Sequence, residues 1–598
     1  FNQPWMLKKF QMGQQCLFSG KPKFRMGRWE FSHPYVQWLE EEDTEGENGV
    51  IIPKYRLTEG LKAGELRFFI RQALESSLSD VADPMPSEWL GNRKLPGITQ
   101  SLRGIHQPQS IEQYRLSRRR LVFDDLFEFQ LGLALRRQAR RKVEKAPVLT
   151  RTAKIDSRIR RLFPFDYTEG QTHAVKEIAR DLASGIGMHR LVQADVGAGK
   201  TVVAIDTMLV AVAHRWQAVM MAPTELLATQ HWETIDEALR ESRVNRALLT
   251  GSLPNSERER VLRGLADGSI HLVVGTQALI QQGVKFRNLG VAVIDEQHKF
   301  GVAQRAAFVN EGCEESPHLL VMTATPIPRT LCLTQFGDLD VTLVKDRPAG
   351  RQSVATSRIT GPAARRRAWE FLIQKLRSGR QLYVVCPLVE ESDDAALVST
   401  AAEEVYRELA SQELSQFKVG LVHGRVPRDQ RDRTMEDFRE RELDVLVATT
   451  VVEVGVDVPN ATLMVILDAE RFGLSQLHQL RGRIARGKYR GYCFLFSESE
   501  TPEAISRLSV LERTNDGFEV AEQDFELRGP GDILGTRQHG SLPLRFSTWI
   551  REEKLLEFAR DEAFELVHSG ELEKPEFAEL KRRVFHRFDQ LLELSRTG

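Results

Sequence analysis

The sequence lacks three features that would each assign it to a class: a cysteine framework, an excess of one charge and a long apolar run. Its five cysteines are dispersed and form no Cys-x-x-Cys pair, which indicates a reducing compartment with neither a disulfide framework nor a zinc site. No apolar run reaches the ~18–20 residues of a membrane-spanning helix. The longest candidate, Val202–Val212, contains Asp206 and is expected to be a buried helix, so we expect no membrane contact.

Charge is balanced over the whole chain, with 83 Lys and Arg residues against 83 Asp and Glu residues. Any surface that binds nucleic acid must therefore be local. Basic residues cluster between positions 115 and 161, either as solvated faces of helices or as a strip that contacts phosphates. The members of this basic strip are Arg115, Arg118, Arg119, Arg120, Arg136, Arg137, Arg140, Arg141, Lys142, Arg151, Lys154, Arg158, Arg160 and Arg161.

The length of 598 residues predicts about three to five domains, and 41% hydrophobic with 28% charged residues is ordinary for a globular protein. The sequence begins at Phe1, inside what looks like folded sequence. We therefore expect a chain that lacks its N-terminal part. A targeting segment upstream, including an organellar one, stays open.

The first 150 residues are expected to form two regions. Residues 1–45 contain the strand-like runs Cys16–Ser19 and Trp29–Ser32 and are expected to be part of a small β domain. Residues 46–150 are expected to be mostly helical. Within them, Leu121–Leu135 carries apolar residues at helical spacing, which predicts a packed helix.

From about residue 160, short apolar runs alternate with amphipathic helices, a pattern typical of parallel β-α-β units. It predicts an α/β fold of two doubly wound parallel-sheet lobes, at residues 151–347 and 348–503, followed by a charged helical region at 504–598. The runs of the first lobe are Leu191–Ala194, Ala218–Ala222, Leu272–Gly275, Val291–Ile294 and Leu319–Met322. Those of the second are Leu382–Cys386, Val419–Val422, Val445–Ala448, Leu463–Leu467 and Tyr492–Phe496.

A phosphate-binding loop is predicted at Ala194–Thr201, where a strand is followed by Gly197, Gly199 and the start of a helix. Backbone N–H groups of such a loop cradle phosphates. Lys200 is expected to reach the β- and γ-phosphates and Thr201 to hold Mg²⁺. Ala194 stands where the first glycine of such loops usually is.

Two acids at the end of a later strand complete the predicted ATP site. Asp295 closes the apolar run Val291–Ile294, where a carboxylate helps to coordinate Mg²⁺. The neighbouring Glu296 is expected to accept a proton from the attacking water. Upstream, Phe163, Phe165 and Gln171 resemble a segment that recognises adenine, with Phe165 stacking on the base and Gln171 reading its edge.

Further motifs resemble those of superfamily-two helicases. By this resemblance, Thr224 in Ala222–Gln230, Thr276 in Gly275–Gln277 and Thr449 contact the nucleic-acid backbone. Thr323–Thr325 resembles the motif that couples hydrolysis to lobe movement. The segment Val447–Pro459 resembles motif five, whose Gly455 and Asp457 are expected to lie at the nucleotide. The segment Gln479–Arg486 resembles motif six, whose Arg483 and Arg486 are expected to act as arginine fingers, although Ala485 replaces a common glycine there.

The long segment Gly517–Gln538 resembles the translocation module shared by the RecG and Mfd families of bacterial DNA motors. In that module a helical hairpin and a loop couple lobe closure to stepping along DNA. The hairpin arginines correspond to Arg507 and Arg528, and the loop glutamine to Gln538. Three other segments favour the RecG family: Asp295–His298, Ile51–Ala73 and Ile105–Leu126.

The start of the chain resembles the wedge of the RecG family, an OB-type β domain that holds a DNA branch point. Phe1 and Trp5 match the aromatics that stack on separated bases there. The alternative is that both side chains only pack within the β domain.

The resemblance implies an ATP- and Mg²⁺-dependent 3′-5′ DNA helicase that acts on forks, Holliday junctions and R-loops in recombination and repair. It further implies a monomer in the bacterial cytoplasm, at the nucleoid, with single-stranded-DNA-binding protein as a candidate partner. Two alternatives remain. One is an Mfd-like translocase, which would need a polymerase-binding domain ahead of the motor. The other is a junction-binding protein without ATPase activity, which the intact Lys200, Asp295 and Glu296 disfavour.

Overall fold

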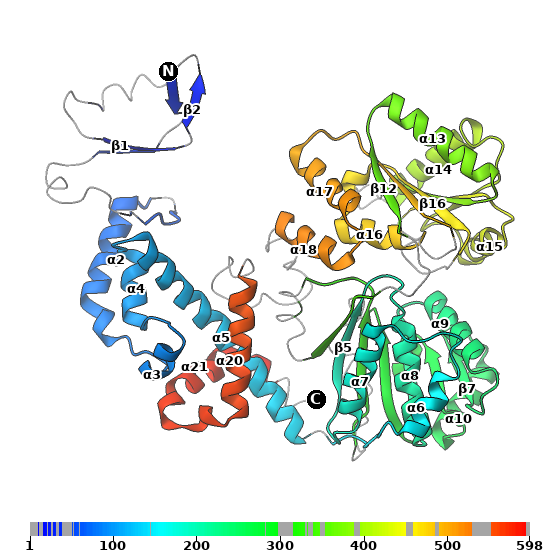
Figure 1. The fold of residues 1–598 in the computed structure, drawn as a ribbon, viewed down its shortest axis with the longest axis horizontal. Helices are drawn as coiled ribbons and strands as arrows, with labels where there is room; N and C mark the ends of the chain where they lie inside the picture. Colours follow the sequence, from blue (N-terminus) through cyan, green and yellow to red (C-terminus); the bar gives the residue numbers. More distant parts are fainter. Residues whose placement is uncertain are drawn as a thin grey trace. The chain divides into compact units, whose positions relative to one another are not determined.

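The computed structural model describes residues 10, 16–20, 22–25, 28–31, 35–38, 51, 53–58, 60–143, 145–281, 283–296, 315–328, 332, 339–346, 353–387, 395–449, 458–484, 489–528 and 552–593. Figure 1 shows the helices and strands of the chain as a ribbon. The chain divides into two compact units. The first comprises residues 1–124 and 574–580. The second comprises residues 125–573 and 581–598.

The first unit contains short strands and a group of helices. Strand β1 (Cys16–Ser19) pairs antiparallel with β4 (Tyr35–Trp38), and β2 (Pro22–Arg25) pairs antiparallel with β3 (Arg28–Phe31). The helices are α2 (Ala63–Ser77), α3 (Ser87–Asn92), α4 (Ile98–His106) and the first part of α5 (Ile111–Val143). Helix α5 confirms the helix expected at Leu121–Leu135. The OB-type fold of the β domain stays a prediction.

A buried arginine organises the helical part of this unit. Arg120 on α5 has no exposed side-chain surface, and its guanidinium contacts Asp83 and Asp124, each at 2.6 Å. It also donates to the carbonyl of Pro96. Such planar, multiple hydrogen bonding is what arginine supplies and lysine does not. Arg120 therefore belongs to neither interpretation of the basic strip, because it is neither solvated nor accessible to phosphate.

The second unit begins with a parallel-sheet lobe, lobe 1. Its described residues form a seven-stranded sheet in the order β11-β5-β10-β9-β6-β8-β7, with every described pairing parallel. The strands are β5 (His189–Ala194), β6 (Gln217–Met221), β7 (Arg246–Leu249), β8 (Leu272–Gly275), β9 (Leu289–Asp295), β10 (His318–Thr323) and β11 (Asp340–Val344). The helices are α6 (Ala153–Arg160), α7 (Glu169–Leu182), α8 (Lys200–Ala213), α9 (Glu225–Ala238) and α10 (Asn255–Asp267).

The central strands of lobe 1 are buried on both faces, which explains their continuous apolar sequence. Met220 lies in the core beneath α7 and α8, whereas its neighbours Val219 and Met221 lie in the core on the other face. Helix α8 itself is almost entirely buried, which confirms the expectation for Val202–Val212.

Lobe 2 repeats this architecture. Its described strands lie in the order β12-β17-β16-β13-β15-β14, again all parallel. They are β12 (Ala355–Ile359), β13 (Gln381–Val385), β14 (Val419–Val422), β15 (Val445–Ala448), β16 (Ala461–Ile466) and β17 (Tyr492–Phe496). The helices are α13 (Pro362–Arg377), α14 (Ala395–Ser411), α15 (Arg428–Arg439) and α16 (Leu474–Gly482). The prediction of two doubly wound lobes is confirmed.

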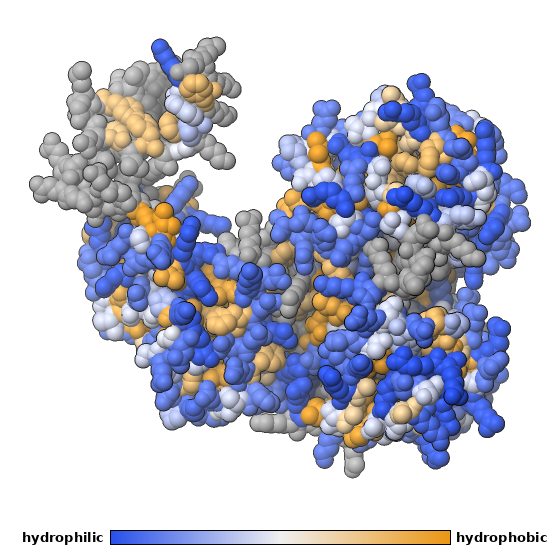
Figure 2. All heavy atoms as spheres, viewed as in Figure 1, coloured by the Kyte–Doolittle hydropathy of each residue, from blue (hydrophilic) through white to orange (hydrophobic). Residues whose placement is uncertain are grey.

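Helices follow lobe 2: α17 (Pro502–Arg513), α18 (Gly517–Arg528), α20 (Glu553–His568) and α21 (Ala578–Glu593). Helices α17 and α18 form a hairpin that packs against α16. Phe588 of α21 packs on Gly132 of α5 and against the ring of Phe129, with ring centroids 5.9 Å apart. In Figure 2, the lobe surfaces are mostly hydrophilic, with hydrophobic side chains in small separate patches.

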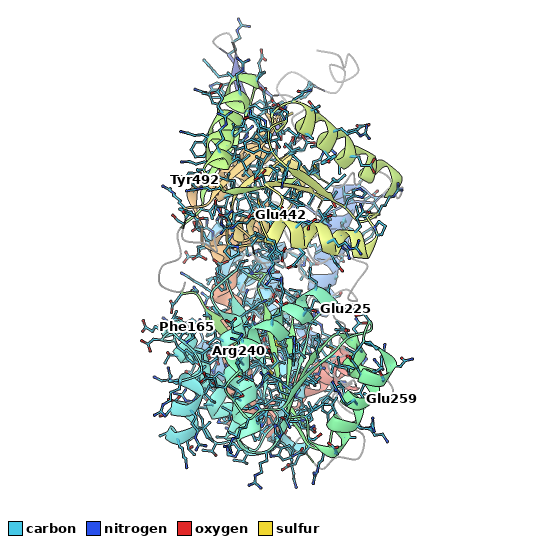
Figure 3. The ribbon with its side chains drawn as sticks, turned by 90° about the vertical axis from the view of Figure 1, so that its right-hand side faces the viewer. Phe165, Glu225, Arg240, Glu259, Glu442 and Tyr492 are labelled. Atoms are coloured by element: carbon cyan, nitrogen blue, oxygen red, sulfur yellow. The ribbon has the colours of Figure 1, made fainter. Side chains whose placement is uncertain are left out.

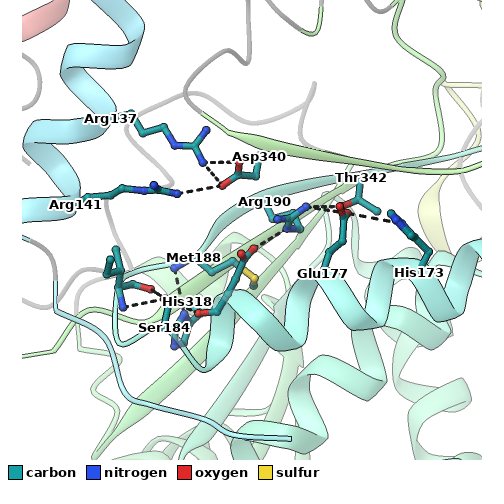
Figure 4. A network of polar contacts seen from close by, with 12 residues as sticks. Arg137, Arg141, His173, Glu177, Ser184, Met188, Arg190, His318, Asp340 and Thr342 are labelled. Carbon is teal, nitrogen blue, oxygen red and sulfur yellow. Dashed lines mark hydrogen bonds and ion pairs between the residues drawn. The ribbon is translucent and has the colours of Figure 1, made fainter. Parts of the chain in front are cut away.

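A second arginine of the basic strip, Arg137, contacts the edge strand of lobe 1 (Figure 4). Arg137 on α5 donates to Asp340 of β11 at 2.6 Å. On the neighbouring strand β5, Arg190 pairs with Asp181 and Glu177 of α7, at 2.7 and 3.0 Å, and donates to Thr342 of β11. This network joins α5, α7 and the edge strand, so Arg137 has a structural role.

Candidate active site

The predicted motifs of lobe 1 lie at one edge of its sheet. Because all its described strands are parallel, their carboxyl ends meet at the same edge, where ligands bind in open α/β sheets. The phosphate-binding loop follows β5, Thr224 follows β6 and Thr276 follows β8, while Asp295 and Thr323 end β9 and β10. The fold therefore gathers segments that lie more than a hundred residues apart in the sequence.

The phosphate-binding loop depends on two left-handed glycines. Gly197 has φ +74° and Gly199 has φ +83°, a region that residues with a Cβ rarely adopt. A Cβ on Gly199 would also lie 2.3 Å from Nε2 of Gln171. Helix α8 begins at the next residue, Lys200, so its N-terminal N–H groups face the loop.

Lys200 lies between the two predicted acids. Its Nζ is 2.8 Å from Oδ1 of Asp295 and 2.7 Å from Oε1 of Glu296. Burial lowers the pKa of Lys200, but the two carboxylates outweigh this, so its pKa is raised. Burial raises the pKa of Asp295, yet Lys200 and His231 bring it below its usual range. Both groups are therefore charged at neutral pH.

A histidine that the sequence did not single out orients Asp295. His231 on α9 is buried, and its Nε2 lies 2.8 Å from Oδ2 of Asp295. This contact fixes the plane of the carboxylate and leaves Oδ1 directed at Lys200. The only signal in the sequence was that His231 directly follows the motif Ala222–Gln230.

Glu296 connects the nucleotide site with the motif at the end of β10. Its backbone has φ +53°, an uncommon conformation for a residue with a Cβ, and such strain clusters at functional sites. Its Oε1 accepts a hydrogen bond of 3.3 Å from the N–H of Ala324, inside Thr323–Thr325. A change in the position of Glu296 would therefore break or displace this hydrogen bond to Thr323–Thr325.

The predicted adenine segment lies beside the loop. Phe165 is half-exposed at the side of lobe 1, where its ring projects outward (Figure 3), and stands 5.7 Å from the ring of Phe163. These two rings line a shallow cavity with Pro164, Tyr167 and Arg160. Gln171 is buried instead. Its amide donates to the carbonyl of Ala198 at 2.9 Å and accepts from the N–H of Thr168, so it braces the phosphate-binding loop.

Lobe 2 reaches the same loop through α16. Gln479 donates to the hydroxyl of Thr325 in lobe 1. His478 lies 2.7 Å from Asp195, and a Cβ on Gly482 would meet Val196 at 2.6 Å. Arg483, a predicted arginine finger, is half-buried at the end of this helix. Asp195 and His478 were not predicted from the sequence.

The predicted nucleic-acid residues occupy varied surroundings. Thr224 caps α9, its hydroxyl accepting from the N–H of Leu227 at 3.3 Å, and Thr276 begins the turn after β8. Thr449 is buried at the end of β15. Arg507 on α17 is half-buried and donates to the carbonyl of Glu470.

Several predicted residues lie outside the described part of the chain: Phe1, Trp5, Gly455, Asp457, Arg486 and Gln538. Arg528 ends α18, but its side chain is not described. In the described ranges, no three His, Cys, Asp or Glu side chains gather as a metal-binding cluster. Nor does any helix there have the length and apolar character needed to cross a membrane.

Three family models match the chain. The DEAD/DEAH box helicase model matches residues 168–333, and the helicase conserved C-terminal domain matches residues 366–488. The model described as ATP-dependent DNA helicase RecG, domain 3, C-terminal, matches residues 514–591. The first model covers most of lobe 1, the second covers most of lobe 2, and the third covers α18, α20 and most of α21.

Curated relatives named ATP-dependent DNA helicase RecG are similar over most of the chain. The Synechocystis protein is 41% identical over 91% of this chain, and the chain spans 65% of its length, just under two thirds. The Bacillus subtilis protein is 39% identical over 97% of the chain, which spans 84% of that relative. A solved structure titled "Structure of RecG bound to three-way DNA junction" has a TM-score of 0.70 and 36% identity, covering 93% of this chain and 73% of that one.

Proposed function

Because this chain belongs to the RecG family of ATP-dependent DNA helicases, we propose that it couples ATP hydrolysis to movement along duplex DNA and to strand separation at branches. One observation carries the proposal. Lys200 lies between Asp295 and Glu296 at the carboxyl edge of lobe 1, while α16 of lobe 2 contacts the same loop through Asp195. An ATPase whose site is shared by two lobes can convert hydrolysis into relative movement of those lobes.

The nucleotide chemistry follows from the geometry. The loop amides and Lys200 bind the phosphates, and Phe165 offers an exposed ring to the base. Thr201 and Asp295 fit Mg²⁺, because a hydroxyl and a carboxylate with phosphate oxygens are the ligands that Mg²⁺ prefers, and His231 already orients Asp295. Bound Mg²⁺ would neutralise developing negative charge on the phosphates.

Each protein side chain then has one task. Glu296 accepts the proton of the attacking water. Arg483 and Arg486 approach the γ-phosphate from lobe 2 and stabilise the charge of the transition state. Gly455 and Asp457 complete the nucleotide site from the same lobe. Gln171 acts indirectly, by bracing the loop through Ala198.

On the DNA side, the proposed substrates are forks, Holliday junctions and R-loops in recombination and repair. Thr224, Thr276 and Thr449 would contact the backbone, and Arg507, Arg528 and Gln538 would transmit movement to the duplex. Phe1 and Trp5 would stack on separated bases in the wedge. The protein would work as a monomer in the bacterial cytoplasm, at the nucleoid, with single-stranded-DNA-binding protein as a candidate partner. The solved relative titled as bound to a three-way DNA junction supports branched DNA as the substrate class.

The test compares ATP hydrolysis with single-stranded DNA, linear duplex and a synthetic fork. Strong stimulation by the fork that Lys200→Ala abolishes is the expected result. Lys176→Ala, an exposed lysine on α7 of the same lobe, is the matched control and should behave as the wild type. Stimulation by plain duplex alone would favour an Mfd-like translocase. Tight fork binding without hydrolysis would favour a junction-binding protein.

A further inference from the structure

The phosphate-binding loop contains a buried carboxylate that does not face the predicted phosphate ligands. Asp195 is 4% exposed and immediately follows β5. Its Oδ1 accepts from the N–H of Val196 at 2.7 Å and lies 2.7 Å from Nε2 of His478 in lobe 2. Its Oδ2 accepts from the N–H of Gly517, the first residue of α18, at 3.4 Å. A single carboxylate therefore contacts the loop, α16 and the hairpin.

The hydrogen-bond chemistry of His478 sets the direction of this chain of contacts. Nδ1 of His478 lies 2.8 Å from Nη2 of Arg481. A guanidinium can only donate, so Nδ1 accepts and the imidazole is neutral, with its proton on Nε2. Nε2 then donates to Asp195. The three side chains form one continuous path, Arg481 to His478 to Asp195, and all three are buried.

The far end of the path lies at the hairpin turn. Nη1 of Arg481 donates to the carbonyls of Leu511 and Thr514, at 2.8 and 2.9 Å. These carbonyls belong to the end of α17, which Arg513 closes, and to the turn that follows. Gly517 opens α18 on the other side of the turn. The network thus holds both ends of the α17–α18 turn, residues 511–517.

Close packing confirms that the turn and the loop meet directly. A Cβ on Gly517 would lie 2.6 Å from Oδ1 of Asp195, 2.6 Å from Nε2 of His478 and 2.7 Å from Cγ of Pro326. A side chain at this position would require the side chains of Asp195, His478 or Pro326 to shift. Because the packing is this close, displacement of the loop at Asp195 would also displace its neighbours.

We propose that His478 is a positioning residue that couples the phosphate-binding loop to the α17–α18 turn through Asp195 and Arg481. The N–H of Val196 is a loop amide and also a donor to Asp195, so a loop that rearranges around phosphates moves this carboxylate. The hydrogen bonds of His478 and Arg481 would then move the α17–α18 turn with it. The inference rests on the proposed function, since it assigns the route by which nucleotide chemistry in lobe 1 reaches the hairpin that would act on DNA.

The test uses the full chain with three substitutions. His478→Leu keeps the bulk and removes both hydrogen bonds. His478→Gln retains one acceptor and one donor and should restore part of the coupling. Ser475→Ala is the matched control. Ser475 lies on the same helix and contacts Asp524 of the hairpin at 3.3 Å, but Asp524 is not part of the loop network.

The first readout needs no DNA. Amide hydrogen exchange across residues 511–520 is measured without nucleotide, with ADP and with a non-hydrolysable ATP analogue. Nucleotide should change the exchange rate of the turn at least about threefold in the wild type and in Ser475→Ala, but not in His478→Leu. An unchanged turn in the wild type, or an undiminished response in His478→Leu with nucleotide bound, would overturn the inference, whatever the protein does to DNA.

The second readout is the ATP consumed for each strand displaced from a fork. For His478→Leu this ratio should rise about tenfold, the size expected for losing a hydrogen bond to a charged group, with His478→Gln between it and the wild type. A proportional fall of hydrolysis and unwinding would overturn the inference, because His478 would then serve hydrolysis alone. A wild type that displaces no strand would instead contradict the proposed function. In that case the hydrogen-exchange measurement alone would test the coupling through His478.

Discussion

Glu296 has an uncommon backbone conformation, with φ +53°, and its Oε1 lies 2.7 Å from Nζ of Lys200. We expect Glu296→Gln to bind ATP almost as the wild type does but to hydrolyse it about 10²- to 10⁴-fold more slowly, because the amide cannot accept a proton. Single-turnover hydrolysis and equilibrium binding of a labelled nucleotide measure the two effects. Unchanged single-turnover hydrolysis would assign the base to another group.

His231 provides a second prediction for a single residue. Because it fixes Asp295 at 2.8 Å, His231→Ala should raise the Mg²⁺ concentration for half-maximal hydrolysis about 10- to 100-fold, as is usual when the partner of a metal ligand is lost. His231→Gln keeps a donor and should lie closer to the wild type. The measurement is a Mg²⁺ titration at fixed ATP. Equal half-saturation in all three proteins would show that Asp295 needs no support.

For single residues, the sequence predicted the side chains that belong to known motifs. It missed the side chains that hold those motif residues in position. Lys200, Asp295 and Glu296 were identified because each follows a strand in a recognisable pattern, and the structure brings them together. His231 and His478 were missed because their partners are 64 and 283 residues away. Only folding creates such pairs. Gln171 was expected to read a base, and the structure shows both ends of its amide engaged by the protein.

Among elements, the strands that sequence patterns missed within the lobes lie at sheet edges. Strands β7 and β11 flank the sheet of lobe 1, and β12 flanks that of lobe 2. Strands β7 and β11 each have two buried side chains, and β12 has none. An edge strand needs no continuous apolar run, so the pattern that identified the central strands was absent there.

The buried guanidinium of α5 supports a prediction about the stability of the first unit. Arg120→Leu should destabilise it by about 3 kcal/mol, the low end for breaking a buried ion pair, because Asp83 and Asp124 keep some access to water. Its neighbour Arg119 is exposed on the same helix, so Arg119→Leu is the control and should cost little. Hydrogen exchange over residues 83–124 reports the local free energy of opening. Equal protection in the two variants would contradict the structural role of Arg120.

At the scale of the whole molecule, the order of the motifs was enough to predict two lobes, but not the contacts by which they meet. Gln479 of lobe 2 donates to Thr325 of lobe 1, and Thr325 belongs to the segment that contacts Glu296. Both residues lie in segments that the sequence identified as motifs, but the motif patterns do not show that these two side chains contact each other. The first residues and the loop after α18 lie outside the described chain, so the predicted roles of Phe1, Trp5 and Gln538 stay predictions.

The contact between the lobes can be tested by a double-mutant cycle. Thr325→Ala and Gln479→Ala should each lower the rate of fork-stimulated hydrolysis. The double variant should hydrolyse ATP no more slowly than the slower of the two single variants. The resulting interaction energy is expected to be about 0.5–3 kcal/mol, as for residues in direct contact. The cycle is measured as the turnover number at saturating fork and ATP. Additive losses would indicate that the two side chains act independently.

The topology of lobe 2 has a consequence for folding during synthesis, because it pairs an early strand with a late one. Strand β12 opens the lobe at Ala355, but its partner β17 ends only at Phe496. At a synthesis rate of about 5–20 residues per second, β12 leaves the ribosome roughly 7–28 s before the strand that covers it. During that time a partly apolar edge has no native neighbour and is open to pairing with other nascent chains. We therefore expect that the growing chain needs protection at this strand edge until β17 has been synthesised.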